Sequence, residues 1–242
     1  MYDISQVIQK ILFLDVECVC LEEKFEELSP RMQQLWTKKA EKFRNADNAH
    51  ATAAELFFEK AAIQAEFGKI ICISCGYIVM EEGQLKMKMK SFSHHDEYIL
   101  LEEFSQMLNQ WFDKSKQGRK VCTHNGREFD IPYIGRRMLI NRMPLPAILN
   151  IQGKKSWNID FILDTQELWR FGDNKAFTSL DLLAAIFNIP SPKDDIDGSQ
   201  VSRVYWETKD LKRIQTYCEK DVMTTANVFL SMNGLPNISS EG

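Results

Sequence analysis

The stretch ILFLDVECVC, residues 11–20, carries two acids in an otherwise apolar segment. Apart from Asp15 and Glu17 it is apolar, and this pattern predicts a short β-strand from about Lys10 to Cys18. Successive strand side chains point to opposite faces, so the two acids project side by side from one face. Two buried neighbouring carboxylates need a counter-charge, which a divalent cation would supply. Solvent exposure at the end of the strand is the alternative.

The remaining chain predicts helices and further strands around this strand. Residues 21–67 are rich in Glu, Lys, Ala and Gln with apolar residues at helical spacing, which predicts an insertion of two or three helices. The elements expected after it are a strand hairpin (69–93), a helix (96–115), a strand (119–125), a helix opening at 130, an edge strand (157–165), a helix (179–187), a helical region (208–232) and a loose tail (233–242). This order predicts an α/β fold, a mixed sheet with helices on its faces, in a single domain spanning residues 1–242.

The composition is that of an ordinary globular protein, with 44% hydrophobic and 26% charged residues among 242. Acids interrupt the longest apolar stretch, so we expect no membrane span and no signal peptide, and a cytoplasmic location. The net charge of −4 argues against a broad basic surface for nucleic acid. The six cysteines lie mostly in apolar runs, which indicates reduced thiols. Cys72 and Cys75 form a C-x-x-C pair, but inside a strand pattern and without a second ligand pair.

Two more acidic sites lie far from the first strand. In CTHNGREFDIPYIGRR, residues 122–137, a buried strand runs into Asn125 and Gly126, and Asp130 opens the next helix. An ordinary helix N-cap is the alternative for this acid. Tyr217 and Asp221 are four residues apart and share one face of the last helical region. A chance pair on a solvated helix is the alternative there.

Taken in order, the motifs are D-x-E on a first strand, N-x-x-x-F-D after a later strand and Y-x-x-x-D on a terminal helix. This set resembles the three exonuclease motifs of the DEDD superfamily, tyrosine subgroup (DEDDy): DnaQ-like 3′-5′ exonucleases with a ribonuclease H-like fold. The segment NGREFDIPYIGRR looks most like the exonuclease domains of family-B DNA polymerases. From about residue 10 to 230, the chain resembles a stand-alone bacterial family of predicted exonucleases related to those proofreading domains.

The resemblance implies a five-stranded mixed sheet and a site with two divalent cations, Mg²⁺ or Mn²⁺. Asp15, Glu17 and Asp221 would hold one ion, and Asp15 would also reach the second. Asp130 would serve the second ion through bound water, and Tyr217 would align the attacking water. Two such ions can activate a water, orient the scissile phosphate and neutralise the leaving oxygen.

The resemblance also implies contacts to the 3′ end of a nucleic acid. The residues implied to lie near the terminal nucleotides are Leu14, Val16, Asn125, Phe129 and Ser179. For Phe129 core packing is favoured over base stacking, and for Ser179 a helix N-cap is an equal alternative. Arg127 and Lys175 are phosphate candidates on charge alone.

Two departures from the family pattern stand out. Cys18 occupies a position where the proofreading enzymes commonly have a threonine, a change that concerns a contact to the 3′ end and not the metal chemistry. The helical insertion is longer than the usual link, and we expect it to form a wall of the substrate groove, a partner surface, or simply to pack on the domain.

The predicted function is metal-dependent hydrolysis of single-stranded DNA from its 3′ end to nucleoside monophosphates. The alternatives are a 3′-5′ exoribonuclease, since one site serves both polymers, and a non-catalytic nucleic-acid-binding module. No polymerase region follows the motifs, so any coupling to a polymerase or repair protein is expected to need a separate partner.

Overall fold

The computed structural model describes residues 7–113, 117–155, 158–173, 175–191 and 195–238. Within these ranges the strands form one five-stranded sheet in the order β3-β2-β1-β4-β5. The strands are β1 (Ile11–Cys20), β2 (Gly68–Glu81), β3 (Gln84–Ser93), β4 (Lys120–Thr123) and β5 (Ile162–Asp164). Strand β2 runs antiparallel to both β1 and β3, whereas β4 and β5 run parallel to β1. This mixed sheet with its flanking helices is the expected ribonuclease H-like α/β fold.

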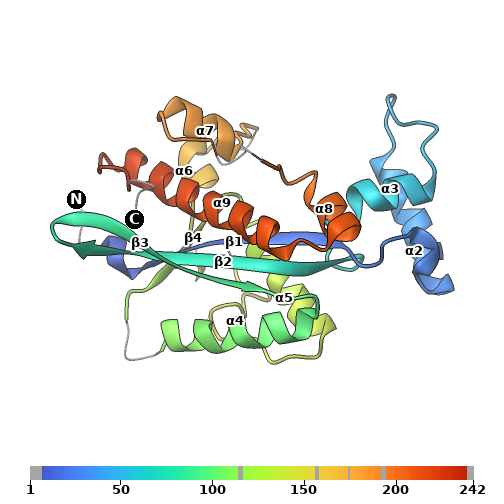
Figure 1. The fold of residues 1–242 in the computed structure, drawn as a ribbon, viewed down its shortest axis with the longest axis horizontal. Helices are drawn as coiled ribbons and strands as arrows, with labels where there is room; N and C mark the ends of the chain where they lie inside the picture. The colour runs from blue at the N-terminus through green and yellow to red at the C-terminus, as the bar shows by residue number, and fades with distance from the viewer. Residues whose placement is uncertain (1–6, 114–116, 156–157, 174, 192–194, 239–242) are drawn as a thin grey trace.

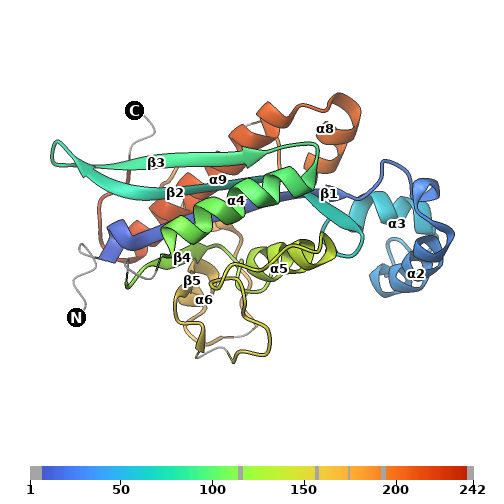
Figure 2. The same cartoon turned by 90° about the horizontal axis from the view of Figure 1, so that it is seen from below.

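Helices cover both faces of the sheet (Figure 1). α4 (Glu97–Trp111) and α5 (Asp130–Ile140) lie on one face, as Figure 2 also shows, and α8 (Val201–Thr208) and α9 (Leu211–Met232) lie on the other. Central β1 is therefore buried on both sides, which explains its nearly continuous apolar sequence. Within the described parts of the chain, no helix combines the length and apolarity that crossing a membrane requires.

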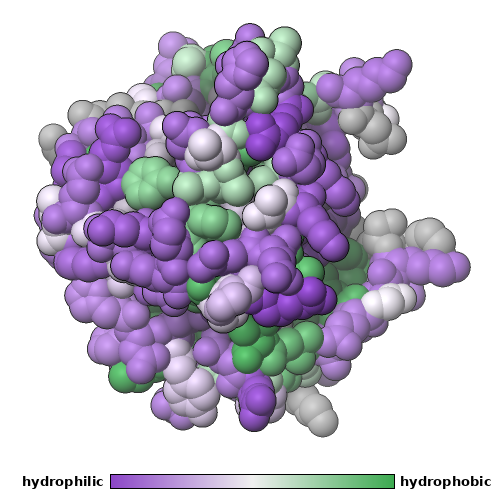
Figure 3. Space-filling view, turned by 90° about the vertical axis from the view of Figure 1, so that its right-hand side faces the viewer, coloured by the Kyte–Doolittle hydropathy of each residue, from purple (hydrophilic) through white to green (hydrophobic). Residues whose placement is uncertain are grey.

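The insertion between β1 and β2 contains two α-helices, α2 (Pro30–Ala40) and α3 (Ala53–Lys60). Short 3-10 turns lie at Phe25–Glu27 and Glu41–Phe43, and a third, Ile8–Lys10, precedes β1. The insertion extends beyond one end of the sheet (Figures 1 and 2), around a small apolar cluster of its own. Seen from that end, the surface is mostly hydrophilic with smaller hydrophobic areas (Figure 3).

Several elements differ from the sequence prediction. α6 (Thr165–Arg170) and α8 were not predicted, whereas α7 (Leu180–Ile186) was. The helical region expected from about Thr208 is the continuous helix α9, which begins at Leu211 because Lys209 has a left-handed φ of 55° and Asp210 caps the helix. The α4 helix ends at Trp111, and the expected end at Ser115 lies outside the described residues. Trp157 of the expected edge strand lies outside them as well.

The expectation of a loose tail is wrong as far as residue 238. Ile238 is only 5% exposed, and it packs with the cluster under α9. The Asn227 side chain accepts a hydrogen bond from the Ile238 N–H at 2.8 Å and donates one to its carbonyl at 3.2 Å. Two apolar residues in this segment, Leu235 and Ile238, were the missed signal. Residues 239–242 lie outside the described residues.

A buried ion pair ties four segments together at one end of the sheet. The Arg137 guanidinium donates to both oxygens of Glu97, with Nη2 at 2.5 Å from Oε2. Arg137 also donates to the Ala65 carbonyl of the insertion at 2.7 Å, and the Ile70 N–H of β2 donates to Glu97 at 2.6 Å. Both side chains are buried. The pair thus joins α4 and α5 to the insertion and to β2.

Replacing Arg137 with methionine should lower the free energy of unfolding by about 3 kcal/mol, because it leaves the buried Glu97 carboxylate without its partner. Urea denaturation would measure the change. Arg136→Met is the matched control, since Arg136 is the exposed neighbour, and its effect should stay within about 0.5 kcal/mol. Equal effects of the two substitutions would contradict a stabilising role for the ion pair.

Candidate active site

The two acids of β1 lie in mid-strand and face α9. Asp15 is paired with Ser74 of β2 and Glu17 with Cys72, and the register shifts between Glu17 and Cys18. Glu17 is 7% exposed, and Asp15 is half-buried. The alternative prediction, that the two acids are exposed to solvent at the end of the strand, is therefore wrong. A β-bulge at this point bends the strand directly after the two acids.

Tyr217 and Asp221 lie on the side of α9 that faces β1. Both are buried, so they are not a chance pair on a solvated helix. The Tyr217 hydroxyl donates a hydrogen bond to the Asp221 carboxylate. Burial, followed by the negative charges of Asp221 and Glu17, holds the pKa of Tyr217 far above its ordinary value. The phenol is therefore a neutral hydrogen-bond donor throughout the working pH range.

Asp130 enters the site from α5, as the first helical residue rather than as its cap, which is Phe129. Strand β4 pairs with β1 only over Ile11–Phe13, and beyond that point the Val16 N–H donates to the Asp130 carboxylate. Gly126 permits this approach, because a Cβ there would lie 2.6 Å from Asp130 Oδ2. The short β4 and this glycine thus bring a distant acid to β1.

Burial and neighbouring carboxylates raise the pKa values of three of the acids, Asp15, Glu17 and Asp130. For Asp15, burial and then the charges of Asp221 and Asp130 raise the pKa, and for Glu17, burial and then Asp15 and Asp221 do so. Burial raises the pKa of Asp130 to about 7, against the opposing effect of its backbone hydrogen bonds. In the described chain, none of Asp15, Glu17 and Asp130 forms an ion pair with a lysine or arginine. The cluster therefore has an excess of negative charge that a cation would neutralise.

A thiol completes the surroundings of Asp15. Ligand atoms of Asp15, Glu17 and Cys218 all lie within 4.8 Å of one another. The Cys218 thiol donates to Asp15 Oδ2 at 3.4 Å, and burial raises the pKa of Cys218, so it stays protonated and orients the carboxylate. The oxygen donors fit a hard divalent cation such as Mg²⁺ or Mn²⁺. The sequence analysis missed Cys218, although it precedes Asp221 by three residues, on the same helix face.

A polar network fixes the position of α9 above the sheet. The Ser74 and Ser91 hydroxyls of β2 and β3 lie 2.9 Å apart, and Ser91 donates to Glu219 of α9 at 2.7 Å. Gln215 also donates to Glu219, at 2.7 Å. Because Ser74 is the cross-strand partner of Asp15, this network holds the helix register that directs Tyr217 and Asp221 at β1.

Residues 61–238 match the model of a family described as a predicted 3′-5′ exonuclease related to the exonuclease domain of PolB. The chain belongs to this exonuclease family. The matched range contains Asp130, Tyr217 and Asp221 but begins after Asp15 and Glu17. The placement of the first two acids in the site therefore depends on the structure.

A solved structure with a similar fold is the family B DNA polymerase from the hyperthermophilic archaeon Pyrobaculum calidifontis, with a TM-score of 0.54 and 13% sequence identity. The similarity covers 92% of this chain but 24% of that polymerase chain. At this identity the match shows a common fold. No curated protein sequence matches the chain.

Asp164, which the sequence analysis also missed, organises the loop that carries Asn125 in this exonuclease domain. Its carboxylate accepts hydrogen bonds from the N–H groups of Asn125 and Arg127, each at 2.9 Å, and caps α6. Asn125 has a left-handed φ of 61°, which asparagine tolerates. The D-x-x-E spacing of Asp164 and Glu167 is typical of the start of a helix, so the sequence contained a signal for this cap.

Arg127 has a structural role in place of the expected phosphate contact. Its guanidinium lies 2.5 Å from Glu167 and donates to the Ile162 carbonyl at 2.7 Å. The charge and both terminal nitrogens are therefore used within the protein, whereas the buried Nε has no hydrogen-bond partner in the described residues. Lys175 is exposed, as expected for the other phosphate candidate.

Most of the other residues expected near the terminal nucleotides take part in packing or helix capping within the protein. The side chains of Leu14 and Val16 are buried in the core on the opposite face of the sheet, so only their backbone is available to the acid site. Phe129 is half-buried and packs on Tyr133 with ring centres 5.2 Å apart. Ser179 caps α7 by accepting a hydrogen bond from the Leu182 N–H at 3.2 Å, which is the N-cap alternative.

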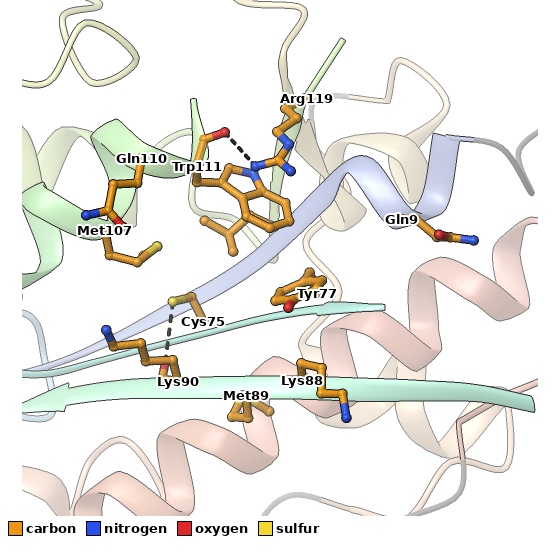
Figure 4. A pocket seen from close by; sticks show the side chains of 11 residues that line it. Gln9, Cys75, Tyr77, Lys88, Met89, Lys90, Met107, Gln110, Trp111 and Arg119 are labelled. Carbon is orange, nitrogen blue, oxygen red and sulfur yellow. Dashed lines mark hydrogen bonds between the residues drawn. The ribbon is translucent and has the colours of Figure 1, made fainter. Parts of the chain in front are cut away.

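A cavity of about 510 Å³ lies away from the acids (Figure 4). Tyr77, Trp111 and Arg119 line it, where the end of α4 meets the sheet. The Arg119 guanidinium lies 3.8 Å from the centre of the Trp111 ring and donates to the Trp111 carbonyl. None of the four acids lines this cavity, so it is not the candidate active site.

Proposed function

We propose that this member of the exonuclease family is a divalent-metal-dependent 3′-5′ exonuclease that releases nucleoside monophosphates from single-stranded DNA. One observation carries the proposal: the charge of Asp221 on α9 helps to raise the pKa values of Asp15 and Glu17 on β1 and of Asp130 on α5. A protein without catalysis has no reason to gather buried acids in this way. DNA is favoured because the similar solved structure is that of a DNA polymerase.

In the proposed site Asp15, Glu17 and Asp221 would hold one cation, and Asp15 and Asp130 would serve a second. When bound, the two cations supply activation of the nucleophilic water and neutralisation of the leaving oxygen. Cys218 orients the carboxylate of Asp15 through its thiol hydrogen bond. The neutral Tyr217 hydroxyl, anchored on Asp221, positions the attacking water.

At the substrate side, the 3′-terminal nucleotides lie beside Asn125, Phe129 and Ser179 in this proposal. The backbone around Leu14 and Val16 contributes main-chain groups, because its side chains point to the core. The Cys18 side chain, half-buried directly after the acids, stands where related enzymes commonly place a threonine.

The function is tested with single-stranded DNA and RNA of one sequence, labelled at the 5′ end, in Mg²⁺, Mn²⁺ or EDTA. The expected result is a ladder that shortens from the 3′ end, needs metal and forms faster on DNA. Faster shortening of RNA would replace the proposal with an exoribonuclease. Binding of both polymers without cleavage in either metal would identify a non-catalytic module.

Replacing Tyr217 with phenylalanine should lower turnover about 10- to 100-fold, because the variant keeps the ring but loses the hydroxyl that positions water. Affinity for Mn²⁺, measured by calorimetry, should change little, since no metal ligand is lost. Tyr98→Phe is the matched control, because Tyr98 is 47% exposed on α4. Unchanged turnover of the Tyr217 variant would exclude this role.

A further inference from the structure

Two lysines converge on two aromatic rings at the end of the sheet nearest the insertion. The Lys69 Nζ lies 4.7 Å from the centre of the Trp206 ring and 5.4 Å from that of Tyr205. The Lys209 Nζ lies 3.6 Å from the Trp206 ring centre and 4.6 Å from that of Tyr205. We call Lys69, Tyr205, Trp206 and Lys209 the lysine–aromatic cluster. Cation–π contact holds both ammonium groups at one place.

No ion pair neutralises either of these two charges in the described residues, although Glu22 and Glu97 attract Lys69 at longer range. Across the described ranges, neither Lys69 nor Lys209 forms an ion pair or donates a side-chain hydrogen bond. Glu22 attracts Lys69, but from beyond ion-pair distance, and burial together with the charge of Lys209 lowers the pKa of Lys69. Two ammonium groups with unused donors, held together against their repulsion, form a site for an anion.

The cluster lies on the same face of the sheet as the acids. Lys69 of β2 is the cross-strand partner of Val19, two residues beyond Glu17 on β1. At about 3.3 Å per residue, this pair lies roughly 7 Å along the strand from the acid. Tyr205 packs in one apolar cluster with Val19 and Tyr217. A strand of nucleic acid whose 3′ end occupies the acid site, and which leaves it along β1 toward the insertion, would pass within reach of the two lysines.

We propose that Lys69 and Lys209 bind a backbone phosphate of the substrate strand, on the 5′ side of the bond that the acids cleave. Phosphate contacts of this kind position a strand without reading its sequence. Trp206 and Tyr205 hold the lysines in place, and Trp206 also packs on the insertion, so the insertion supports this part of the binding surface. This inference rests on the proposed function.

The test compares the wild type with the double variant Lys69→Gln/Lys209→Gln, in the full chain and in EDTA so that no cleavage occurs. Anisotropy of a fluorescent single-stranded oligonucleotide, titrated at several salt concentrations, measures Kd. The double variant should bind about 10-fold more weakly at low salt, and the loss of one phosphate contact should reduce the slope of log K against log salt by about 0.7. With metal present, KM should rise by a similar factor and kcat should change little.

The matched control is Lys38→Gln/Lys42→Gln, which removes the same charge from two exposed lysines of the insertion and should bind like the wild type. Lys69→Arg/Lys209→Arg should restore the salt slope, and circular dichroism verifies that each variant is folded. An unchanged Kd and slope in the glutamine variant, with active wild-type protein, would overturn the phosphate site alone. Lysine-dependent binding without any cleavage by the wild type would overturn the exonuclease and retain the site.

Discussion

Replacing Asp15 with asparagine is expected to lower exonuclease turnover by at least about 1000-fold while leaving the fold intact. The amide keeps the shape of the side chain but removes the charge that interacts with Glu17, Asp130 and Asp221. A bound metal contributes several kcal/mol to transition-state stabilisation, and a factor of 1000 corresponds to about 4 kcal/mol. Timed digestion of a 5′-labelled oligonucleotide measures the change.

The matched control for this substitution is Asp47→Asn, which makes the same chemical change at an exposed position in the insertion. Its turnover should equal that of the wild type. Digestion by the Asp15 variant at the wild-type rate would mean either a contaminating nuclease or a catalytic centre elsewhere. Inactivity of the control variant would mean that the assay reports general damage to the fold.

The metal-free protein should become less stable as pH rises from about 5 to 8. Burial holds the pKa of Asp130 at about 7, above the ordinary 3.8, so the folded state retains a proton that the unfolded state has lost. Stability therefore falls between these two pKa values and stays low above the upper one. At about 1.4 kcal/mol per pKa unit, the loss from this residue is on the order of 4 kcal/mol at most. Asp15 and Glu17 act in the same direction, because their pKa values are also raised.

Melting temperatures in EDTA across this pH range test the linkage. The Asp130→Asn variant has no ionisable group at position 130. Its melting temperature should therefore fall less as pH rises, and at pH 8 it should exceed that of the wild type. Mn²⁺ should raise the wild-type melting temperature more at pH 8 than at pH 5, because the ligands must be ionised to bind it. Asp47→Asn should follow the wild-type profile. A melting temperature that rises with pH in metal-free wild type would refute the linkage.

The local periodicities of the sequence were enough to predict which acids share a face. Alternation along a strand places Asp15 beside Glu17, and a spacing of four on a helix places Tyr217 beside Asp221. The β2–β3 hairpin, the two helices of the insertion and α7 followed from the same kind of pattern. These features depend on neighbouring residues, so the sequence alone determines them.

The tertiary structure decided which side chains from distant segments meet. Asp130 reaches β1 because β4 ends early and Gly126 leaves room, and no spacing in the sequence states either condition. The sequence likewise does not predict that the Cys218 thiol donates to Asp15. Nor does it distinguish the buried Arg137 from the other basic residues near it. Such contacts depend on strand order and packing between segments far apart in the chain, and only the folded molecule specifies these.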